Sequence, residues 1–217
     1  MLQADTGENY VSIAPSDFPP GAFDRLDQDD DSLFYVPTRL VTHIDDVAIA
    51  ALSQFYDKVL RPRTVVLDLM SSWVSHLPEG LDLSEIIGHG MNEQELAANP
   101  RLTRWFVQDL NRDTALSLES DSIDAAFCCV SAQYLQKPIE VFEQVRPVLK
   151  PGSPFIVSYS NRCFPTKAVA IWRSLDLQGH AALIKLYMER AGFGSIAVEV
   201  LSSGMHGDPL IAVVGHA

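Results

Sequence analysis

The sequence predicts an α/β fold, a doubly wound and mostly parallel sheet with helices on both faces. Apolar segments alternate with amphipathic ones between residues 64 and 159, which is typical of parallel strands joined by crossover helices. Residues 65–69 form a continuous apolar run broken only by Asp68, as in a strand buried on both faces. The last two apolar segments are joined by a turn-rich loop and predict an antiparallel pair.

Each element follows from its local pattern. The seven predicted strands cover residues 64–69, 85–89, 103–108, 123–130, 154–159, 197–201 and 210–214. The predicted helices cover residues 37–60, a segment that begins at Asn92, residues 138–149, and residues 168–190 with a break at Gly179. Roughly the first 35 residues are rich in Pro, Asp and Gly and predict an irregular arm. The first five strands are expected to be parallel.

Composition limits the function classes. The chain has 217 residues, 47% of them hydrophobic and 20% charged, which is typical of a single globular domain. The formal net charge of −12, with only 16 Lys and Arg, argues against a nucleic-acid or anionic-lipid partner. A small-molecule or protein partner is therefore expected, and the sequence predicts no oligomeric state.

The cysteines and the N-terminus indicate a compartment. Cys128, Cys129 and Cys163 are odd in number and lack metal-ligand spacing, so neither a disulfide framework nor a metal site is predicted. The N-terminus lacks the basic and apolar regions of a signal peptide, and no window approaches the ~18 apolar residues of a membrane span. A cytoplasmic protein that does not enter membranes is expected.

Residues at the ends of several predicted strands resemble one family. The matching segments are Leu67-Asp68-Leu69, Gly88-His89-Gly90-Met91-Asn92, Val107-Gln108-Asp109-Leu110-Asn111, residues 122–127 and, most specifically, residues 141–153. Over residues 55–214 the chain resembles the class I S-adenosylmethionine-dependent methyltransferases of the type 11-like group. This resemblance implies a Rossmann-like, seven-stranded sheet with an antiparallel C-terminal strand, and S-adenosylmethionine as cofactor. Residues 1–217 would then form one domain, with an N-terminal arm and lid helix over 1–60 and a cofactor-binding core over 61–217.

The first motif of that family departs from its pattern here. Asp68 is kept, but Met70, Ser71, Ser72 and Trp73 occupy the loop in which the family has glycines. In one interpretation the serine hydroxyls replace the backbone contacts of the glycine loop, and Trp73 packs beneath the cofactor. In the other, the site is inactive and the two serines cap a following helix.

The second motif also departs from the family, whereas the third matches it. Gly90 stands where the family usually has an acid for the ribose diol, so Asn92 or Glu93 would have to accept those hydrogen bonds. Alternatively, Asn92 is only the N-cap of a helix. The resemblance implies that Asp109 accepts from the adenine amino group and that the backbone of Leu110 meets the ring. The predicted cofactor-binding residues are Asp68, Met70, Ser71, Ser72, Gly90, Met91, Asn92, Gln108, Asp109, Leu110, Val130 and Ser131.

The acceptor side is expected at positions where members of the family vary. The predicted catalytic residues are His43, a general base if the acceptor must lose a proton, and Tyr134, which the resemblance places where the family often lines the methyl-transfer pocket. The predicted substrate-binding residues are Tyr35, Arg39, Gln133, Arg162 and Cys163. The two arginines match a carboxylate or phosphate on the acceptor. Each residue also has an ordinary interpretation, as a solvated arginine, a core aromatic or histidine, or a structural thiol.

These observations favour a methyltransferase that acts on a small molecule. The sulfonium already activates the methyl group, so holding donor and acceptor in line supplies most of the acceleration. An alternative is a catalytically inactive, methyltransferase-like interaction or ligand-binding module. A protein that uses another nucleotide is a third, which the absence of a phosphate-binding G-x-x-x-x-G-K or intact G-x-G-x-x-G segment disfavours.

Overall fold

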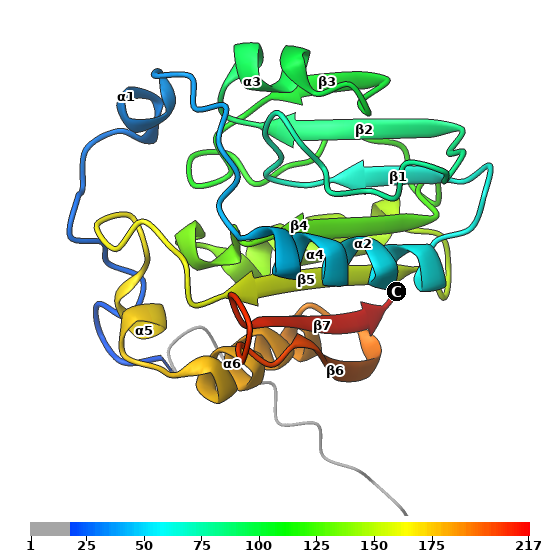
Figure 1. Cartoon of the computed structure of the whole chain (residues 1–217). Helices are drawn as coiled ribbons and strands as arrows, with labels where there is room; N and C mark the ends of the chain where they lie inside the picture. Colours follow the sequence, from blue (N-terminus) through cyan, green and yellow to red (C-terminus); the bar gives the residue numbers. More distant parts are fainter. Residues whose placement is uncertain (1–17) are drawn as a thin grey trace, which may run out of the picture.

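The computed structural model describes residues 18–217, so the first 17 residues of the predicted arm lie outside the described part. Its sheet has seven strands in the order β3-β2-β1-β4-β5-β7-β6 (Figure 1). In chain order these are β1 Val65–Asp68, β2 Glu85–Gly90, β3 Arg104–Val107, β4 Ala125–Cys129, β5 Pro154–Ser160, β6 Gly194–Ser202 and β7 Leu210–His216. β1 to β5 are parallel, and β7 runs antiparallel to β5 and β6. The predicted fold class is confirmed.

Helices cover both faces of this sheet (Figure 1). The helices are α1 Asp31–Tyr35, α2 Asp46–Val59, α3 Glu93–Ala98, α4 Pro138–Val148, α5 Ala170–Arg173 and α6 Leu177–Arg190, and a short 3₁₀ turn covers Ala132–Tyr134. On one face, α2 buries Leu52 and Tyr56 against the strands. On the other, α4 and α6 bury Phe142 and Tyr187. The sheet is therefore the middle layer between two apolar cores.

No helix follows β1 in the described chain. Residues 69–84 connect β1 to β2 as an irregular segment, and its Leu77 and Leu81 pack into the same core as α2. Two leucines thus cover part of the sheet that a crossover helix ordinarily covers. The interpretation of Ser71 and Ser72 as caps of a following helix is wrong, because that helix is absent.

Two predicted helices have different bounds. The helix predicted over 37–60 begins only at Asp46, because Asp45 caps it by accepting a hydrogen bond of 2.9 Å from the backbone of Ala48. The break predicted at Gly179 lies instead between α5 and α6, at residues 174–176. Gly179 is in the first turn of α6, where its backbone donates to the Asp176 cap over 2.8 Å.

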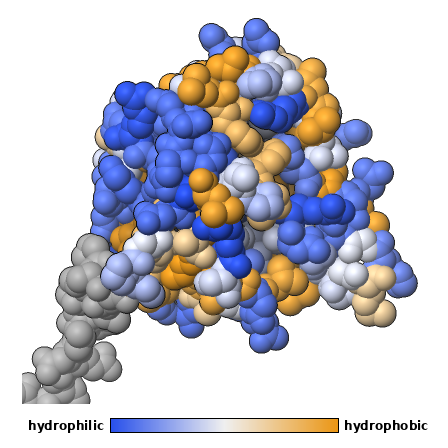
Figure 2. All heavy atoms as spheres, turned by 90° about the vertical axis from the view of Figure 1, so that its left-hand side faces the viewer, coloured by the Kyte–Doolittle hydropathy of each residue, from blue (hydrophilic) through white to orange (hydrophobic). Residues whose placement is uncertain are grey.

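The N-terminal segment is more ordered than predicted. Residues 18–30 pack against the chain around α5, with backbone hydrogen bonds from Ala170 to Asp24 and from Ile171 to Ala22, both 2.8 Å. Helix α1 follows, and then residues 36–45 cross the carboxyl ends of the parallel strands; we call these ten residues the strap. Figure 2 shows this face of the molecule, on which hydrophobic patches lie among hydrophilic side chains.

A buried ion cluster links α1 to distant parts of the chain. The side chain of Lys167 is fully buried, and its ammonium lies 3.2 Å from Asp31 and 3.1 Å from Asp27. The other partner of Asp31 is Arg25, whose side chain is almost as deeply buried. The amide of Asn111 also donates to Asp31, over 3.0 Å. Ion pairs and a hydrogen bond between residues far apart in the sequence therefore hold the N-terminal segment over the carboxyl ends of the parallel strands.

Candidate functional site

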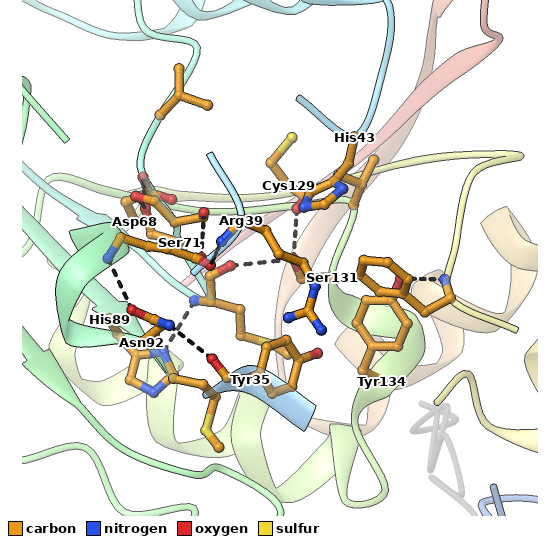
Figure 3. A pocket seen from close by; sticks show the side chains of 18 of the residues that line it. Tyr35, Arg39, His43, Asp68, Ser71, His89, Asn92, Cys129, Ser131 and Tyr134 are labelled. Atoms are coloured by element: carbon orange, nitrogen blue, oxygen red, sulfur yellow. Dashed lines mark hydrogen bonds between the residues drawn. The ribbon is translucent and has the colours of Figure 1, made fainter. Parts of the chain in front are cut away.

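A cavity of about 330 Å³ lies at the carboxyl ends of β1, β2 and β4, beneath α1 and the strap (Figure 3). The strand order reverses between β1 and β4, and open α/β sheets bind their ligands at such a switch point. The volume is at the lower end of the range found for small-molecule sites. Every site residue predicted from the sequence lines this cavity except Gln133.

Two of the sequence-based expectations have to be corrected. Gln133 is buried, and its amide donates to the backbone of Val130 over 2.7 Å rather than reaching the cavity. Trp73 does not line the cavity either, because its indole N–H donates to the backbone oxygen of Val41 over 2.9 Å. Trp73 therefore fastens the strap to the loop after β1 and does not pack beneath a cofactor.

His89 organises the loop that has lost its glycines. Its Nδ1 accepts from the backbone of Met70 over 3.1 Å, so its Nε2 carries the proton and donates to the backbone oxygen of Gln108 over 3.0 Å. Burial lowers the pKa of His89 to about 4, so the ring is neutral. The side chain joins the ends of β1, β2 and β3, a role that sequence reasoning missed although it quoted the Gly88-His89-Gly90 segment.

The loop passes very close to β2 at Gly90. The backbone N–H of Ser71 donates to the carbonyl of His89 over 2.6 Å. A β-carbon added at Gly90 would lie 2.5 Å from the carbonyl oxygen of Ser71, closer than such atoms approach. The path of the loop therefore explains why the acid of the family's second motif is missing at this position.

Asp68 is a buried carboxyl group at the floor of the cavity. Its Oδ2 accepts from the hydroxyl of Ser71 over 2.6 Å. Burial raises the pKa of Asp68 to about 7, although hydrogen bonds from Ser71 and Ser75 act in the opposite direction. The group therefore changes its charge near neutral pH.

The free energy of unfolding is expected to record this shift. Between pH 4 and pH 7 the folded protein keeps the proton of Asp68 while the unfolded chain loses it, so the contribution of Asp68 to stability falls as the pH rises. The free energy of unfolding of Asp68→Asn minus that of wild type should therefore increase as the pH rises. Near pH 5–6 this increase should reach about 1.4 kcal/mol per pH unit. Urea denaturation from pH 4.5 to 8 measures the difference. For the exposed control Asp57→Asn, the curve of unfolding free energy against pH should be parallel to that of wild type. A parallel curve for Asp68→Asn would contradict the raised pKa given to Asp68.

Asn92 is the N-cap of α3. Its Oδ1 accepts from the backbones of Gln94 and Glu95 over 2.9 and 3.0 Å, and its Nδ2 donates to the backbone of Tyr35 over 2.8 Å. The N-cap interpretation is therefore confirmed. Because the amide oxygen already accepts two hydrogen bonds, it is a poor acceptor for ribose hydroxyls. Glu93, the other residue considered for that role, does not line the cavity.

Glu95 brings a carboxylate to the cavity that sequence reasoning missed. It is nearly buried, with Oε1 accepting from the backbone of Arg39 over 2.7 Å and Oε2 from the hydroxyl of Ser72 over 2.8 Å. It thus joins the strap to the loop after β1. A signal was present, because Asn92-x-x-Glu95 has the spacing of a capping box, in which the third helical residue turns back toward the start of the helix.

The end of β3 supplies a further carboxylate of the cavity wall. Asp109 accepts from the backbone of Asn111 over 2.9 Å and lines the cavity together with Gln108 and Leu110. Asn111 in turn donates to the backbone oxygen of Tyr134 over 3.1 Å. The residues that the resemblance assigns to adenine therefore share one wall.

The opposite wall is aromatic. The hydroxyl of Tyr134 accepts from the backbone of Phe164 over 2.9 Å, and burial raises its pKa to about 12, so it stays protonated. The ring of His43 meets Phe164 edge to face at 5.3 Å. Burial lowers the pKa of His43, which therefore stays neutral at pH 7. His76 also lines the cavity, and burial lowers its pKa to about 4.

Residues from the strap and from the loop after β5 complete this wall. Tyr35 and Arg39 come from the N-terminal segment, and Arg162 and Cys163 follow β5. Burial raises the pKa of the Cys163 thiol, which disfavours a reactive thiolate. The predicted acceptor residues other than Gln133 are thus brought together.

Within residues 18–217 no group of three or more His, Cys, Asp or Glu side chains is arranged to hold a metal ion. In the same residues no helix has both the length and the apolar character needed to cross a membrane.

Comparisons with known proteins agree with the fold. Residues 79–157 match the family model described as "Methyltransferase domain", a match that begins after the loop that lacks glycines. No curated protein matches the chain. An S-adenosylmethionine-dependent methyltransferase from Mesorhizobium loti is 17% identical, with a TM-score of 0.55 over 77% of this chain and 98% of that one. One from Archaeoglobus fulgidus is 14% identical, with a TM-score of 0.58 over 78% and 93%.

A third neighbour has a different named activity. The [4+2]-cyclase SpnF is 14% identical and has a TM-score of 0.61, over 83% of this chain and 88% of that one. At these identities the neighbours show a shared fold. Together with the matched family model, they confirm the predicted resemblance to class I methyltransferases.

Proposed function

We propose that this chain, with its methyltransferase-like fold and a methyltransferase-domain match over residues 79–157, transfers a methyl group from S-adenosylmethionine to a small molecule. One observation carries the proposal, a cavity at the switch point of the sheet with four carboxyl groups on its walls. Asp31 is paired with Arg25 and Lys167, whereas Asp68, Glu95 and Asp109 form no ion pair with another described residue.

The chemistry of these groups fits the cofactor. S-adenosylmethionine presents an ammonium, a sulfonium, two ribose hydroxyls and an adenine amino group, which are cationic or can donate hydrogen bonds. Carboxylates are the strongest acceptors for such groups. Asp109 and the backbone of Leu110 are suited to the adenine edge. Glu95, from α3, is suited to the ribose hydroxyls in place of the acid that Gly90 excludes.

The residues of the chain have modest chemical tasks. The bound cofactor supplies the activated methyl group. The strap and α1 form part of the cavity wall, and their role is to hold the acceptor against the aromatic residues of that wall. His43, neutral at pH 7, is available to accept a proton from an acceptor that must lose one. Tyr134 stays protonated and keeps the loop after β5 in place through Phe164.

Calorimetric titration with S-adenosylhomocysteine tests the cofactor site without knowledge of the acceptor. We expect micromolar binding to wild type and about tenfold or greater weakening in Asp109→Ala, because a hydrogen bond to a charged group contributes about 1.5–3 kcal/mol. Asp113→Ala is the matched control, since this exposed carboxylate caps the same loop over 3.0 Å without lining the cavity. Equal losses in the two variants would contradict the role given to Asp109.

The inactive module remains the second candidate. The loop after β1 favours this candidate, because Ser71 lies against Gly90 and the loop has no glycine that would let its backbone make room for a cofactor. If wild-type protein shows neither heat nor a thermal shift with S-adenosylhomocysteine, this candidate replaces the first.

A further inference from the structure

Arg39 is held in the cavity wall with its guanidinium directed inward (Figure 3). One of its terminal nitrogens donates to the backbone oxygen of Phe34 over 2.8 Å, and the other lies 3.3 Å from that of Pro37. The guanidinium carbon lies 4.6 Å from the centre of the Phe34 ring and 5.9 Å from that of Phe164. These contacts fix the plane of the fork while leaving N–H groups for a ligand.

No carboxylate of the described residues forms an ion pair with Arg39, although acidic groups line the same cavity. Asp31 is paired with Arg25 and Lys167. Glu95 accepts from the backbone of Arg39, and its carboxylate is outside ion-pair distance of the guanidinium. The other cavity-lining arginine, Arg162, is neutralised by Asp208 at 2.8 Å. Among the described residues that line the cavity, Arg39 is therefore the arginine whose charge has no internal partner.

We infer that the methyl acceptor carries a carboxylate, which pairs with the guanidinium of Arg39 while the apolar part of the acceptor lies against the aromatic wall. The inference rests on the proposed function. The wall is close by, because Phe164 contacts Phe34, His43 and Tyr134 with ring centres 5.2, 5.3 and 6.0 Å apart. An uncompensated, pre-oriented fork beside apolar rings matches a small aromatic or aliphatic acid.

The acceptor is the favoured source of this carboxylate, but the cofactor also has one. Arg39 contacts Phe34 and Phe164 on the wall formed by the N-terminal segment and the loop after β5. The carboxylates suited to the cofactor lie on the walls formed by β1, α3 and the end of β3. The two sources predict different behaviour when Arg39 is replaced, so one set of variants distinguishes them.

The test compares acids with their amides, which have nearly the same size and shape. Benzoate and benzamide, 4-hydroxybenzoate and 4-hydroxybenzamide, and phenylacetate and phenylacetamide are titrated by NMR into wild-type protein, with and without S-adenosylhomocysteine. We expect at least one acid to bind at least tenfold more tightly than its amide, and this preference to fall below twofold in Arg39→Gln. The control Arg104→Gln, at a residue of the edge strand β3 that pairs with Glu85 and does not line the cavity, should keep the preference.

Each other outcome overturns the inference. If no acid binds better than its amide, or if the preference survives in Arg39→Gln, the guanidinium does not bind an acceptor carboxylate. If Arg39→Gln weakens S-adenosylhomocysteine about tenfold, Arg39 serves the carboxylate of the cofactor. Failure of the proposed function is separate, because it would appear as absent S-adenosylhomocysteine binding in wild type. Thermal melting of each variant verifies that the strap remains folded.

Discussion

Replacing Gly90 by aspartate is expected to destabilise the protein rather than to restore the acid that the family has at this position. The new β-carbon would collide with the carbonyl of Ser71, 2.5 Å away. Relief requires the loop to move, which breaks the hydrogen bonds of 2.6 and 3.1 Å that Ser71 and Met70 make with His89. Overpacking together with a newly buried carboxylate should cost about 3 kcal/mol or more, or about 6–12 °C in Tm.

Two further variants separate the effect of the steric collision from that of the buried carboxylate. Gly90→Ala introduces the collision without the carboxylate and is expected to lose about 2 kcal/mol. Gly80→Ala is the control, since a β-carbon there has nothing within 4 Å. Urea denaturation of the three variants measures the losses. A Gly90→Ala protein as stable as wild type would mean that the loop does not lie against β2 as described.

Loss of the Lys167 ammonium is the second large effect we expect. Lys167→Met removes a fully buried cation that lies within 3.2 Å of Asp31 and 3.1 Å of Asp27. Removing one partner from a buried ion pair costs about 3–5 kcal/mol, because the remaining charge stays desolvated. Asp31 lines the cavity, so the loss should also loosen α1 and weaken the binding of S-adenosylhomocysteine.

Lys185→Met is the matched control for this change. Lys185 is half exposed on α6 and pairs with Glu189 at 3.7 Å, a surface pair worth no more than about 0.5 kcal/mol. Hydrogen exchange at α1 and the strap gives the local readout. Equal stability of the two methionine variants would show that the buried cluster does not hold the N-terminal segment.

The sheet was predictable because its signals are local. Residues 65–69 read as a buried strand from their own apolar character, and the two C-terminal segments read as a hairpin from the turn between them. The strap was not predictable, because its order comes from distant partners. Trp73 holds Val41, and Lys167 holds Asp31 from 136 positions away. The spacing of the apolar residues within 37–45 matches that of a helix, so the helix was predicted from residue 37. It begins at Asp46, because Asp45 is its N-cap.

The candidate site was predictable where residues follow parallel strands. Asp68, Gly90, Asp109 and Ser131 meet at one edge because the carboxyl ends of such strands do. The site residues that the sequence did not reveal connect several secondary-structure elements through their side chains. His89 reads as an ordinary strand residue until the loop is seen to wrap around it, and no local pattern reveals this.

Because the loop after β1 lacks glycines, the groups that it offers to a ligand include titratable side chains. A glycine loop holds a ligand through backbone groups, whose charge does not vary with conditions. Here the cavity floor is a carboxyl group that titrates near pH 7, and the loop above it relies on a histidine that must stay neutral to accept from Met70. The charge of this floor is therefore expected to change near neutral pH, and ligand binding in the cavity is expected to depend on pH more strongly than binding by a backbone loop would.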